Sequence, residues 1–373
     1  MLVPLEPALL QATRATPILE MDTTDHLRDV AHLGSANYDS LRTQFFNAKV
    51  PLVNPAEIWR PRTTAEVVTA VVGAKTRGQN VGVRSGGHTL TCPALVEGGI
   101  LIDTVNLNRE IAYNADDYIV SFAPSTTSRE LSEFLTGVGR FFPFSHYPTV
   151  AMGGFILAGG QGWFAREFGY TSESWIEQVE IVMPDGQTII ASQTEHKDIF
   201  WAVPGSGHGF FGVITKIWAR TIPARKLYHS TVTFDSTGKI DDLIEWAMNA
   251  CDAAPTEGVD ITITTSFADK GSGSGDDSDD SRIYLTIDTT IYRESLEEAQ
   301  TASEMLSRFP IEFNDSLVAV NPVKEASWSY VWEVQTSRIP AAGKYRRQGD
   351  SLLTNPQATN EQVSLQCKLI IFS

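Results

Sequence analysis

The segment from Pro148 to Trp163 is the strongest local constraint on the fold, because it reads PTVAMGGFILAGGQGW and holds five glycines within ten residues. Glycine costs about 1 kcal/mol relative to alanine in a helix interior, so a regular helix in water is not expected here. A flexible linker would be polar, whereas this segment is largely apolar. The pattern therefore favours a backbone that comes close to a ligand such as a pyrophosphate or a flat ring.

Two further glycine-rich motifs flank this segment. The first is Arg84-Ser85-Gly86-Gly87-His88, which predicts a glycine turn after a strand, where backbone N–H groups can meet a phosphate. For His88 alone, a capping or hydrogen-bonding role in a loop is the competing interpretation. Residues 200–215 read FWAVPGSGHGFFGVIT and again precede a predicted strand. None of the three motifs matches GxGxxG before a dinucleotide helix or a Walker loop, so a Rossmann unit is not expected.

The region from 51 to 226 predicts a mixed arrangement of strands and helices. A helix at 64–78, capped by Thr63 or Thr64 and ended by Gly78, lies between two strand candidates and forms a β-α-β unit. The other predicted elements are strands at 98–108 and 118–124, a helix at 128–139 capped by Ser128, a hairpin at 175–192 that turns at Pro184-Asp185-Gly186, and a strand at 209–224. The preceding residues 25–48 look helical.

The pattern changes after residue 226. Segments at 227–234, 259–267 and 282–292 alternate apolar and polar residues, as strands of an antiparallel sheet do, and helices are expected at 241–253 and 295–309. Residues 269–281 hold five aspartates but lack the closing glutamate of an EF-hand, so a solvated loop is expected rather than a calcium site. The last fifty residues show no clear periodicity. The fold class is therefore α+β, in two domains.

Composition excludes several classes of function. The 45 acidic and 29 basic residues give a net charge of −16, which disfavours nucleic-acid binding. We see no apolar run of membrane-spanning length and no signal peptide. Membrane anchoring is therefore not expected, and we expect a cytoplasmic location. The three cysteines, Cys92, Cys251 and Cys367, are widely spaced, which predicts free thiols and no metal site.

Taken in order, the three motifs resemble the FAD-binding domain shared by vanillyl alcohol oxidase, p-cresol methylhydroxylase (the PCMH type) and the berberine bridge enzyme branch. The resemblance runs from about residue 51 to 226. It implies an N-terminal helical extension at 1–50, a PCMH-type FAD-binding domain at 51–226 and a substrate domain at 227–373. The family's Tyr- and Asn-rich segment near the C-terminus has no counterpart here, so the substrate domain is expected to be incomplete at that end.

The resemblance also implies the site residues. His88 is the position that carries the covalent bond to the flavin 8α carbon, and Tyr147 with His146 are expected beside the flavin as candidate catalytic residues. The implied cofactor-binding residues are Arg84, Ser85, Gly86, Gly87, His88, Pro148, Thr149, Val150, Gly153, Gly154, Gly159, Gly160, Gly162, Gly212 and Val213. Many berberine bridge enzymes have a cysteine where this chain has Tyr147, so a second flavin bond is excluded at that position. The pattern is closer to the singly linked 6-hydroxy-D-nicotine oxidase type.

The activity that the resemblance implies is oxidation of a small molecule in secondary metabolism. Hydride would pass from an alcohol or amine carbon to FAD, a nearby base would take the proton, and O2 would reoxidise the flavin. A dehydrogenase that excludes oxygen is an alternative within this class. The alternatives from other classes are a flavin-binding, redox-silent protein of cyclase-like or degenerate type, and a cofactor-free remnant of the fold. The oligomeric state and the substrate are left open.

Overall fold

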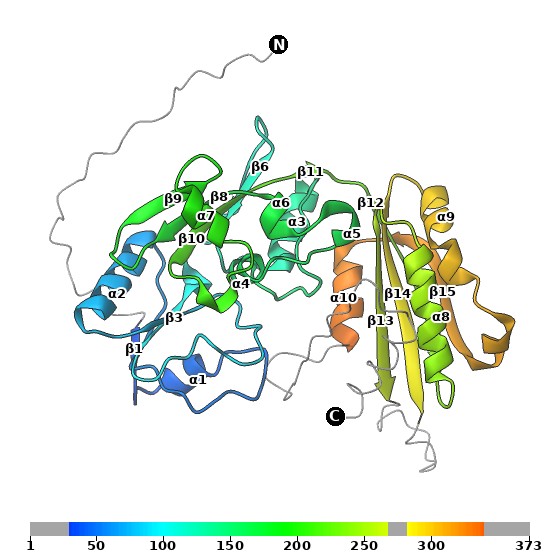
Figure 1. The fold of residues 1–373 in the computed structure, drawn as a ribbon, viewed down its shortest axis with the longest axis horizontal. Helices are drawn as coiled ribbons and strands as arrows, with labels where there is room; N and C mark the ends of the chain where they lie inside the picture. The colour runs from blue at the N-terminus through cyan, green and yellow to red at the C-terminus, as the bar shows by residue number, and fades with distance from the viewer. Residues whose placement is uncertain (1–29, 268–281, 339–373) are drawn as a thin grey trace.

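The computed structural model describes residues 30–267 and 282–338, and these residues form two α+β regions side by side (Figure 1). The N-terminal region, residues 30–223, contains two main sheets, and the C-terminal region, residues 226–338, contains one. This confirms the predicted fold class. The polar segment 269–281 and the residues after 338 lie outside the described residues, so the prediction of a solvated loop stays a prediction.

The first sheet has the strand order β1-β2-β4-β3. Its strands are β1 (Val30–His32), β2 (Glu57–Trp59), β4 (Ile100–Asp103) and β3 (Val81–Arg84). β2 and β3 both pair in parallel with β4, and α2 (Thr64–Thr76) connects β2 to β3, which confirms the predicted β-α-β unit. Thr63 caps α2 by accepting the N–H of Glu66, and Gly78 follows the helix with a φ of +64°.

The second sheet is antiparallel and has the order β5-β6-β10-β8-β9. Its strands are β5 (Ala112–Asn114), β6 (Ile119–Phe122), β10 (Val213–Arg220), β8 (Ile176–Val182) and β9 (Thr188–Ser192). β8 and β9 form the predicted hairpin, and Gly186 in its turn has a φ of +90°. A short pair, β7 (Arg140–Phe141) with β11 (Ile222–Pro223), leads to the C-terminal region.

Short helices surround these sheets. Besides α2 they are α1 (Tyr38–Arg42), α3 (Ser128–Gly137), α4 (Met152–Leu157), α5 (Ala165–Phe168), α6 (Thr171–Ser174) and α7 (Lys197–Ala202), with 3-10 turns at Thr104–Asn106 and Gly207–Gly209. The glycine-rich segment does contain one short helix, α4. The free-energy cost of placing glycines in this helix is offset because Met152 and Ile156 are fully buried in the core.

Two expectations for local structure were wrong. A helix was predicted over 25–48, but among the described residues of this segment only α1 is α-helical. β1 and a turn at Gly34, which has a φ of +90°, precede α1. The cap of α3 is Thr127 and not Ser128. Thr127 and Glu130 form a reciprocal capping box, whereas the Ser128 hydroxyl bonds to that of Ser145 at 2.7 Å.

The C-terminal region is one antiparallel sheet in the order β13-β14-β12-β15, covered on one face by helices. Its elements are β12 (Lys226–Asp235), α8 (Ile240–Ala253), β13 (Val259–Phe267), β14 (Ile283–Arg293), α9 (Leu296–Ser307), the 3-10 turn Ile311–Ser316, β15 (Leu317–Ala326) and α10 (Trp328–Arg338). Val232 and Phe234 of β12 pack on α8 and α9. The sequence pattern did not indicate α10, which buries Val331 and Trp332 on one side.

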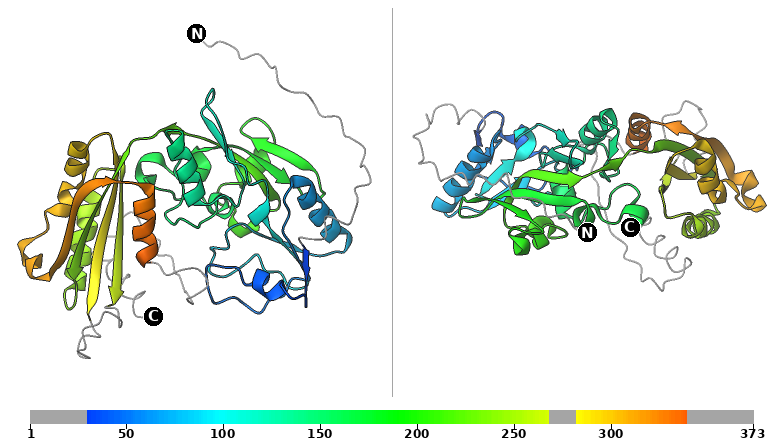
Figure 2. Two further views of the ribbon diagram at one scale, coloured as in Figure 1. Left: turned by 180° about the vertical axis from the view of Figure 1, so that it is seen from behind. Right: turned by 90° about the horizontal axis from the view of Figure 1, so that it is seen from above.

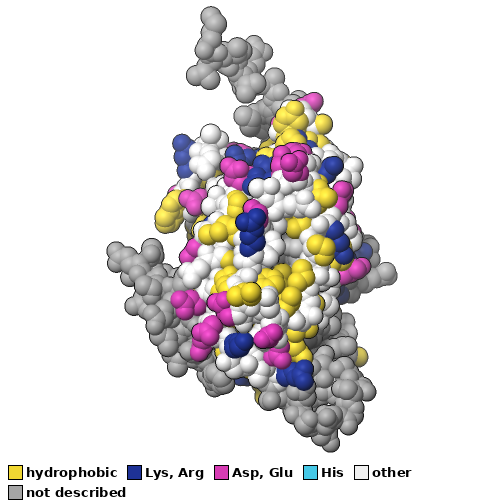
Figure 3. Space-filling model, turned by 90° about the vertical axis from the view of Figure 1, so that its right-hand side faces the viewer, with side chains coloured by type: hydrophobic (Ala, Val, Ile, Leu, Met, Phe, Trp, Pro, Cys, Tyr) yellow, Lys and Arg dark blue, Asp and Glu magenta, His cyan; other side chains and the backbone are white. Residues whose placement is uncertain are grey.

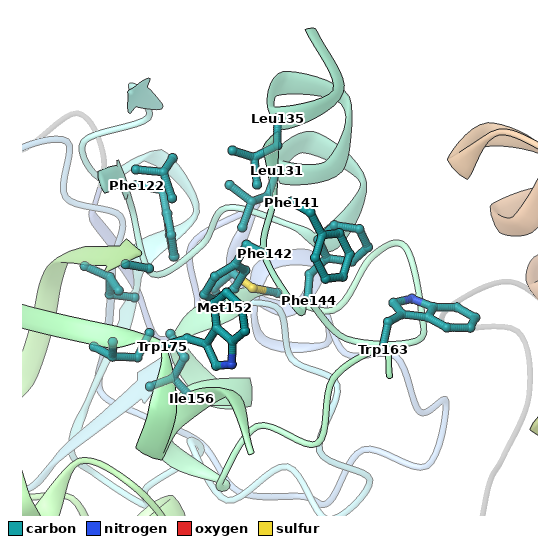
Figure 4. Close-up of a cluster of buried hydrophobic side chains, with 14 of the residues drawn as sticks. Phe122, Leu131, Leu135, Phe141, Phe142, Phe144, Met152, Ile156, Trp163 and Trp175 are labelled. Atoms are coloured by element: carbon teal, nitrogen blue, oxygen red, sulfur yellow. The ribbon is translucent and has the colours of Figure 1, made fainter. Parts of the chain in front are cut away.

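One of the hydrophobic core clusters crosses the boundary between the two regions. Phe141, Phe164 and Tyr292 pack together across the boundary, with the Phe164 and Tyr292 rings stacked at 5.2 Å. α10 lies between the C-terminal sheet and the N-terminal region in all views (Figures 1 and 2), and the Trp332 indole N–H donates to Ser132 of α3 at 3.1 Å. Figure 4 shows Trp163 at the margin of the phenylalanine cluster.

The far end of the C-terminal region shows hydrophobic side chains gathered at the middle of its face and charged ones around them (Figure 3). Large hydrophobic residues exposed in this region include Ile311, Val318 and Val320. β15 is the edge strand there, and Pro322 and Lys324 within it disfavour pairing with another strand. Among the described residues, we find no helix with the length and apolar character that a membrane crossing requires.

Candidate functional site

A cavity of about 510 Å³ opens where the end of β3, α4 and the loop before β10 meet. This volume lies within the range of about 300–1,000 Å³ that is usual for small-molecule sites. The structure brings nine of the predicted cofactor-binding residues to its wall: Arg84, Ser85, Gly86, Gly87, His88, Val150, Gly153, Gly154 and Gly212. Residues from all three glycine-rich motifs therefore meet at one cavity.

Glycines allow the walls of this cavity to come together. A Cβ at Gly86 would lie 2.8 Å from the Ala151 Cβ, and a Cβ at Gly153 would lie 2.7 Å from the Ser85 Oγ. The Arg84–His88 loop and α4 can therefore touch only because these positions lack side chains. At Gly154 a Cβ would meet no atom within 4 Å, so this glycine leaves open space on the cavity wall.

The other predicted cofactor-binding residues lie outside the cavity wall. Gly160 and Gly162 instead pack closely against other segments of the protein. A Cβ at Gly162 would lie 2.1 Å from the Pro143 carbonyl oxygen. Val213 is buried in the core beneath the first sheet. Pro148, Thr149 and Gly159 do not line the cavity either, but Thr149 reaches it indirectly through His88.

His88 is half-buried at the edge of the cavity, and side chains from two distant segments fix its ring. Its Nε2 is 2.8 Å from the Thr149 hydroxyl oxygen. Phe46 stacks on the imidazole at 4.4 Å with an interplanar angle of 23°, and the Tyr147 ring lies 5.7 Å away. The Phe46 N–H also donates to the Gly87 carbonyl, so the loop and the N-terminal segment are joined by backbone as well. The sequence analysis did not anticipate Phe46.

The guanidinium of Arg84 has a structural role. It is buried and donates to the Asp103 carboxylate at 2.8 Å and to the Leu41 carbonyl at 2.8 Å. Its charged group is thus already paired within the protein. Arg84 therefore lines the cavity, but its guanidinium is not available to bind a phosphate.

A second polar cluster lies between the two regions. The His146 Nε2 is 3.0 Å from an Asp260 carboxylate oxygen, and the Phe164 backbone N–H donates to the same oxygen at 3.0 Å. The His146 ring lies 4.4 Å from Trp163, whose indole N–H is buried and has no hydrogen-bond partner in the described structure. Tyr147, next in sequence to His146, contacts the Phe46 ring at 5.3 Å.

Asp260 belongs to a polar face of the C-terminal sheet. Because side chains alternate along strands, the residues that face away from α8 and α9 are set by the register. They are Asp260, Thr262, Thr264, Thr286, Asp288, Thr290, His229, Thr231 and Thr233. Sequence reasoning missed Asp260, since alternation in 259–267 predicted a polar face but not what that face would meet. Among the residues that the structure describes, no group of three or more His, Cys, Asp or Glu could hold a metal ion.

The fold and part of the sequence are similar to those of known proteins. Residues 55–192 match the family described as "FAD binding domain", so this part of the chain is similar to an FAD-binding domain. The chain is 34% identical over 214 residues to the FAD-linked oxidoreductase ptmO of Penicillium ochrochloron, an alignment that covers 57% of this chain and 47% of that one. It is 29% identical over 181 residues to a xylooligosaccharide oxidase of Thermothelomyces thermophilus, covering 48% and 36%. The chain thus spans about half the length of the first of these relatives.

Solved structures show the same fold. 6-Hydroxy-D-nicotine oxidase from Arthrobacter nicotinovorans superposes with a TM-score of 0.71 at 20% identity, covering 84% of this chain and 65% of that one. Carbohydrate oxidase from Microdochium nivale gives a TM-score of 0.65 at 23% identity, covering 82% and 61%. The chain is therefore homologous to FAD-linked oxidoreductases, and its fold is the two-domain PCMH type that the three motifs predicted.

Proposed function

We propose that this protein binds FAD covalently through His88 and oxidises an alcohol or amine carbon of a small molecule, with O2 as the electron acceptor. The observation that supports this most is the placement of His88 at the edge of a glycine-lined cavity, with its ring fixed by Phe46 and Thr149. The naming of relatives as FAD-linked oxidoreductases and oxidases agrees with it.

The residues present fit an FAD molecule. The Arg84–His88 loop and α4 form a backbone cradle, and the open space at Gly154 is what close approach by a phosphate or ring requires. The Ser85 hydroxyl and the loop N–H groups would hold the pyrophosphate, and His88 would hold the flavin end. When bound, the flavin supplies the acceptor for a hydride.

The chain's own side chains then have separable tasks. Phe46 and Thr149 orient the imidazole of His88. The Trp163 ring packs against His146 at 4.4 Å and partly shields the polar cluster between the regions. The polar face of the C-terminal sheet provides hydroxyl and carboxylate groups that can bind a hydroxyl- or amine-bearing substrate.

The experiment that tests the proposal has two stages. The full chain and its His88→Ala variant are precipitated in acid, and yellow colour is sought in the pellet. We expect a yellow wild-type pellet and a colourless variant pellet. The wild-type protein is then mixed without oxygen with glucose, xylobiose, benzyl alcohol and N-methylbenzylamine, and loss of the flavin colour is followed. Bleaching by one of them, reversed by air with formation of hydrogen peroxide, is the expected result.

Other outcomes decide against parts of the proposal. Yellow colour in the supernatant alone would mean bound but unlinked FAD, and the role of His88 would be lost. A covalent flavin that dithionite bleaches but no donor of the panel does would favour the redox-silent alternative. Folded protein with no flavin in either fraction would overturn the proposal as a whole.

A further inference from the structure

The pair formed by His146 and Asp260 joins the two regions beside the candidate flavin site. His146 is in the loop that precedes Thr149, and Asp260 is near the start of β13 on the polar face of the C-terminal sheet. Both side chains are partly shielded, with 35% of the His146 side chain and 15% of the Asp260 side chain exposed. The shortest separation, 3.0 Å between Nε2 and a carboxylate oxygen, is that of a hydrogen bond.

The chemistry of the pair fixes which nitrogen carries the proton. An ionised carboxylate can only accept hydrogen bonds, and the same oxygen already accepts the Phe164 N–H. His146 must therefore donate from Nε2, which leaves Nδ1 of the neutral imidazole as the nitrogen with a lone pair. A carboxylate that holds an imidazole in one tautomer in this way also stabilises the imidazolium that forms when the ring takes a proton.

The surroundings place this imidazole near the proposed flavin attachment point. Tyr147, the next residue, lies within ring contact of His88, the proposed flavin attachment point. Trp163 contacts His146 on the other side and has a buried indole N–H without a partner in the described structure. A buried donor of that kind costs about 1–3 kcal/mol unless something accepts its hydrogen bond.

We propose that His146 is the proton acceptor of the reaction and that Asp260 is the residue that positions it. This inference rests on the proposed function. The O–H or N–H bond of the substrate breaks and its proton forms a bond with Nδ1 of His146. The hydrogen on the same carbon would leave with its electron pair as a hydride, for which bound FAD would supply the two-electron acceptor, and a C=O or C=N bond would form. The imidazolium is paired with Asp260 and later returns the proton to solvent.

A purely structural role for Asp260 is the competing explanation, because its carboxylate also holds the Phe164 N–H, where φ is +60°. A double-mutant cycle separates the two. The rate of anaerobic flavin bleaching is measured for His146→Gln, Asp260→Asn and the double variant, with the first donor of the panel that bleaches wild type. We expect each single variant to slow bleaching by about 10²-fold or more, and the double variant to be no slower than His146→Gln. Asp260→Glu should recover part of the rate.

Glu167→Gln is the matched control. Glu167 is another carboxylate that joins the two regions, through Arg225 at 2.8 Å and the Gly258 N–H at 2.6 Å. Loosening this contact should combine additively with His146→Gln, because Glu167 does not contact His146. If Asp260→Asn also combines additively with His146→Gln, its role is structural and the proposal is overturned.

A readout without turnover is available from the histidines. In protein labelled with ¹⁵N-histidine, the signals that disappear in His146→Gln identify this ring, and their shifts should report a protonated Nε2 and an unprotonated Nδ1. The opposite tautomer would overturn the inference while leaving the covalent flavin test unaffected. Failure of the whole donor panel contradicts the proposed function instead, and with it the reaction in which the pair takes part.

Discussion

Arg84 and Asp103 form an ion pair with 2.8 Å between Nη2 and Oδ2, and each side chain is only 3% exposed. The two residues are register partners at the ends of β3 and β4, directly before the His88 loop. The pair therefore anchors the start of that loop. Removing one partner of a buried ion pair leaves an uncompensated charge and typically costs about 3–5 kcal/mol.

We expect Asp103→Asn to lower the free energy of unfolding by about that amount, measured by urea denaturation. The control is Glu57→Gln, which breaks the more exposed Glu57–Arg77 pair and should cost about 1 kcal/mol or less. Equal losses in the two variants would mean that the buried pair is not an anchor.

Thr149→Val should reduce covalent attachment of FAD without unfolding the protein. Valine keeps the shape of threonine but cannot bond to His88 Nε2. The expected result is a smaller yellow fraction in the acid pellet and a larger one in the supernatant. Thr149→Ser, which retains the hydroxyl, should behave as wild type, and full linkage in Thr149→Val would show that the hydroxyl does not orient the imidazole.

Gly162→Ala and Gly154→Ala should separate stability from cofactor binding. A Cβ at Gly162 would lie 2.1 Å from the Pro143 carbonyl oxygen, so we expect a loss of about 1–3 kcal/mol in the free energy of unfolding. A Cβ at Gly154 meets no atom, so this variant should stay stable but project a methyl group into the cavity. Its flavin content per folded protein should fall, and an unchanged content would place the cofactor away from α4.

The stability of the protein at alkaline pH should depend on Tyr292. Burial raises the pKa of its hydroxyl well above the ordinary value of 10.0. The unfolded chain therefore loses this proton first, and the free energy of unfolding falls as pH rises above 10.0, by at most about 1.4 kcal/mol per pH unit from this group. Burial also raises the pKa of Cys251 to about 11, so the Tyr292 contribution must be taken as a difference between variants.

Tyr292→Phe is the variant that isolates it. This change removes the hydroxyl that accepts the Arg225 N–H at 2.8 Å, so we expect a loss of about 1 kcal/mol at neutral pH. The alkaline slope of the free energy of unfolding should become shallower than in wild type. Parallel pH profiles for the two proteins would contradict the assignment.

Local patterns in the sequence predicted most of the elements in the described structure. The β-α-β unit, the 175–192 hairpin and the strands β12, β13 and β14 follow from periodicity and turn residues, whose effects are local, whereas β15 was not predicted. The failures have physical reasons as well. Thr127 is the cap of α3 because its backbone is extended and because Glu130 forms a reciprocal hydrogen bond with it. The residue types alone did not distinguish Thr127 from its neighbour Ser128. α10 was missed because Trp332 is buried by residues that are distant in the sequence, among them Ser132.

The candidate site likewise contains parts that the sequence predicted and parts that it did not. Glycine spacing located the loops that meet at the cavity, because close backbone approach requires glycine at fixed positions. It could not tell Gly154, which borders open space, from Gly162, which contacts Pro143. Glycine spacing gave no indication of Phe46 or Asp260, because their partners His88 and His146 are far away in the sequence.

The core that continues from Phe141 through Phe164 to Tyr292 and Trp332 also bears on how such proteins can evolve. Where two domains have separate cores, recombination between relatives can exchange one and keep the other. Here an exchange at the boundary near residue 226 would place side chains from two lineages against each other within the one close-packed cluster that crosses it. New substrate preferences in this fold are therefore expected to arise by substitution on the polar sheet face more readily than by exchange of the C-terminal region.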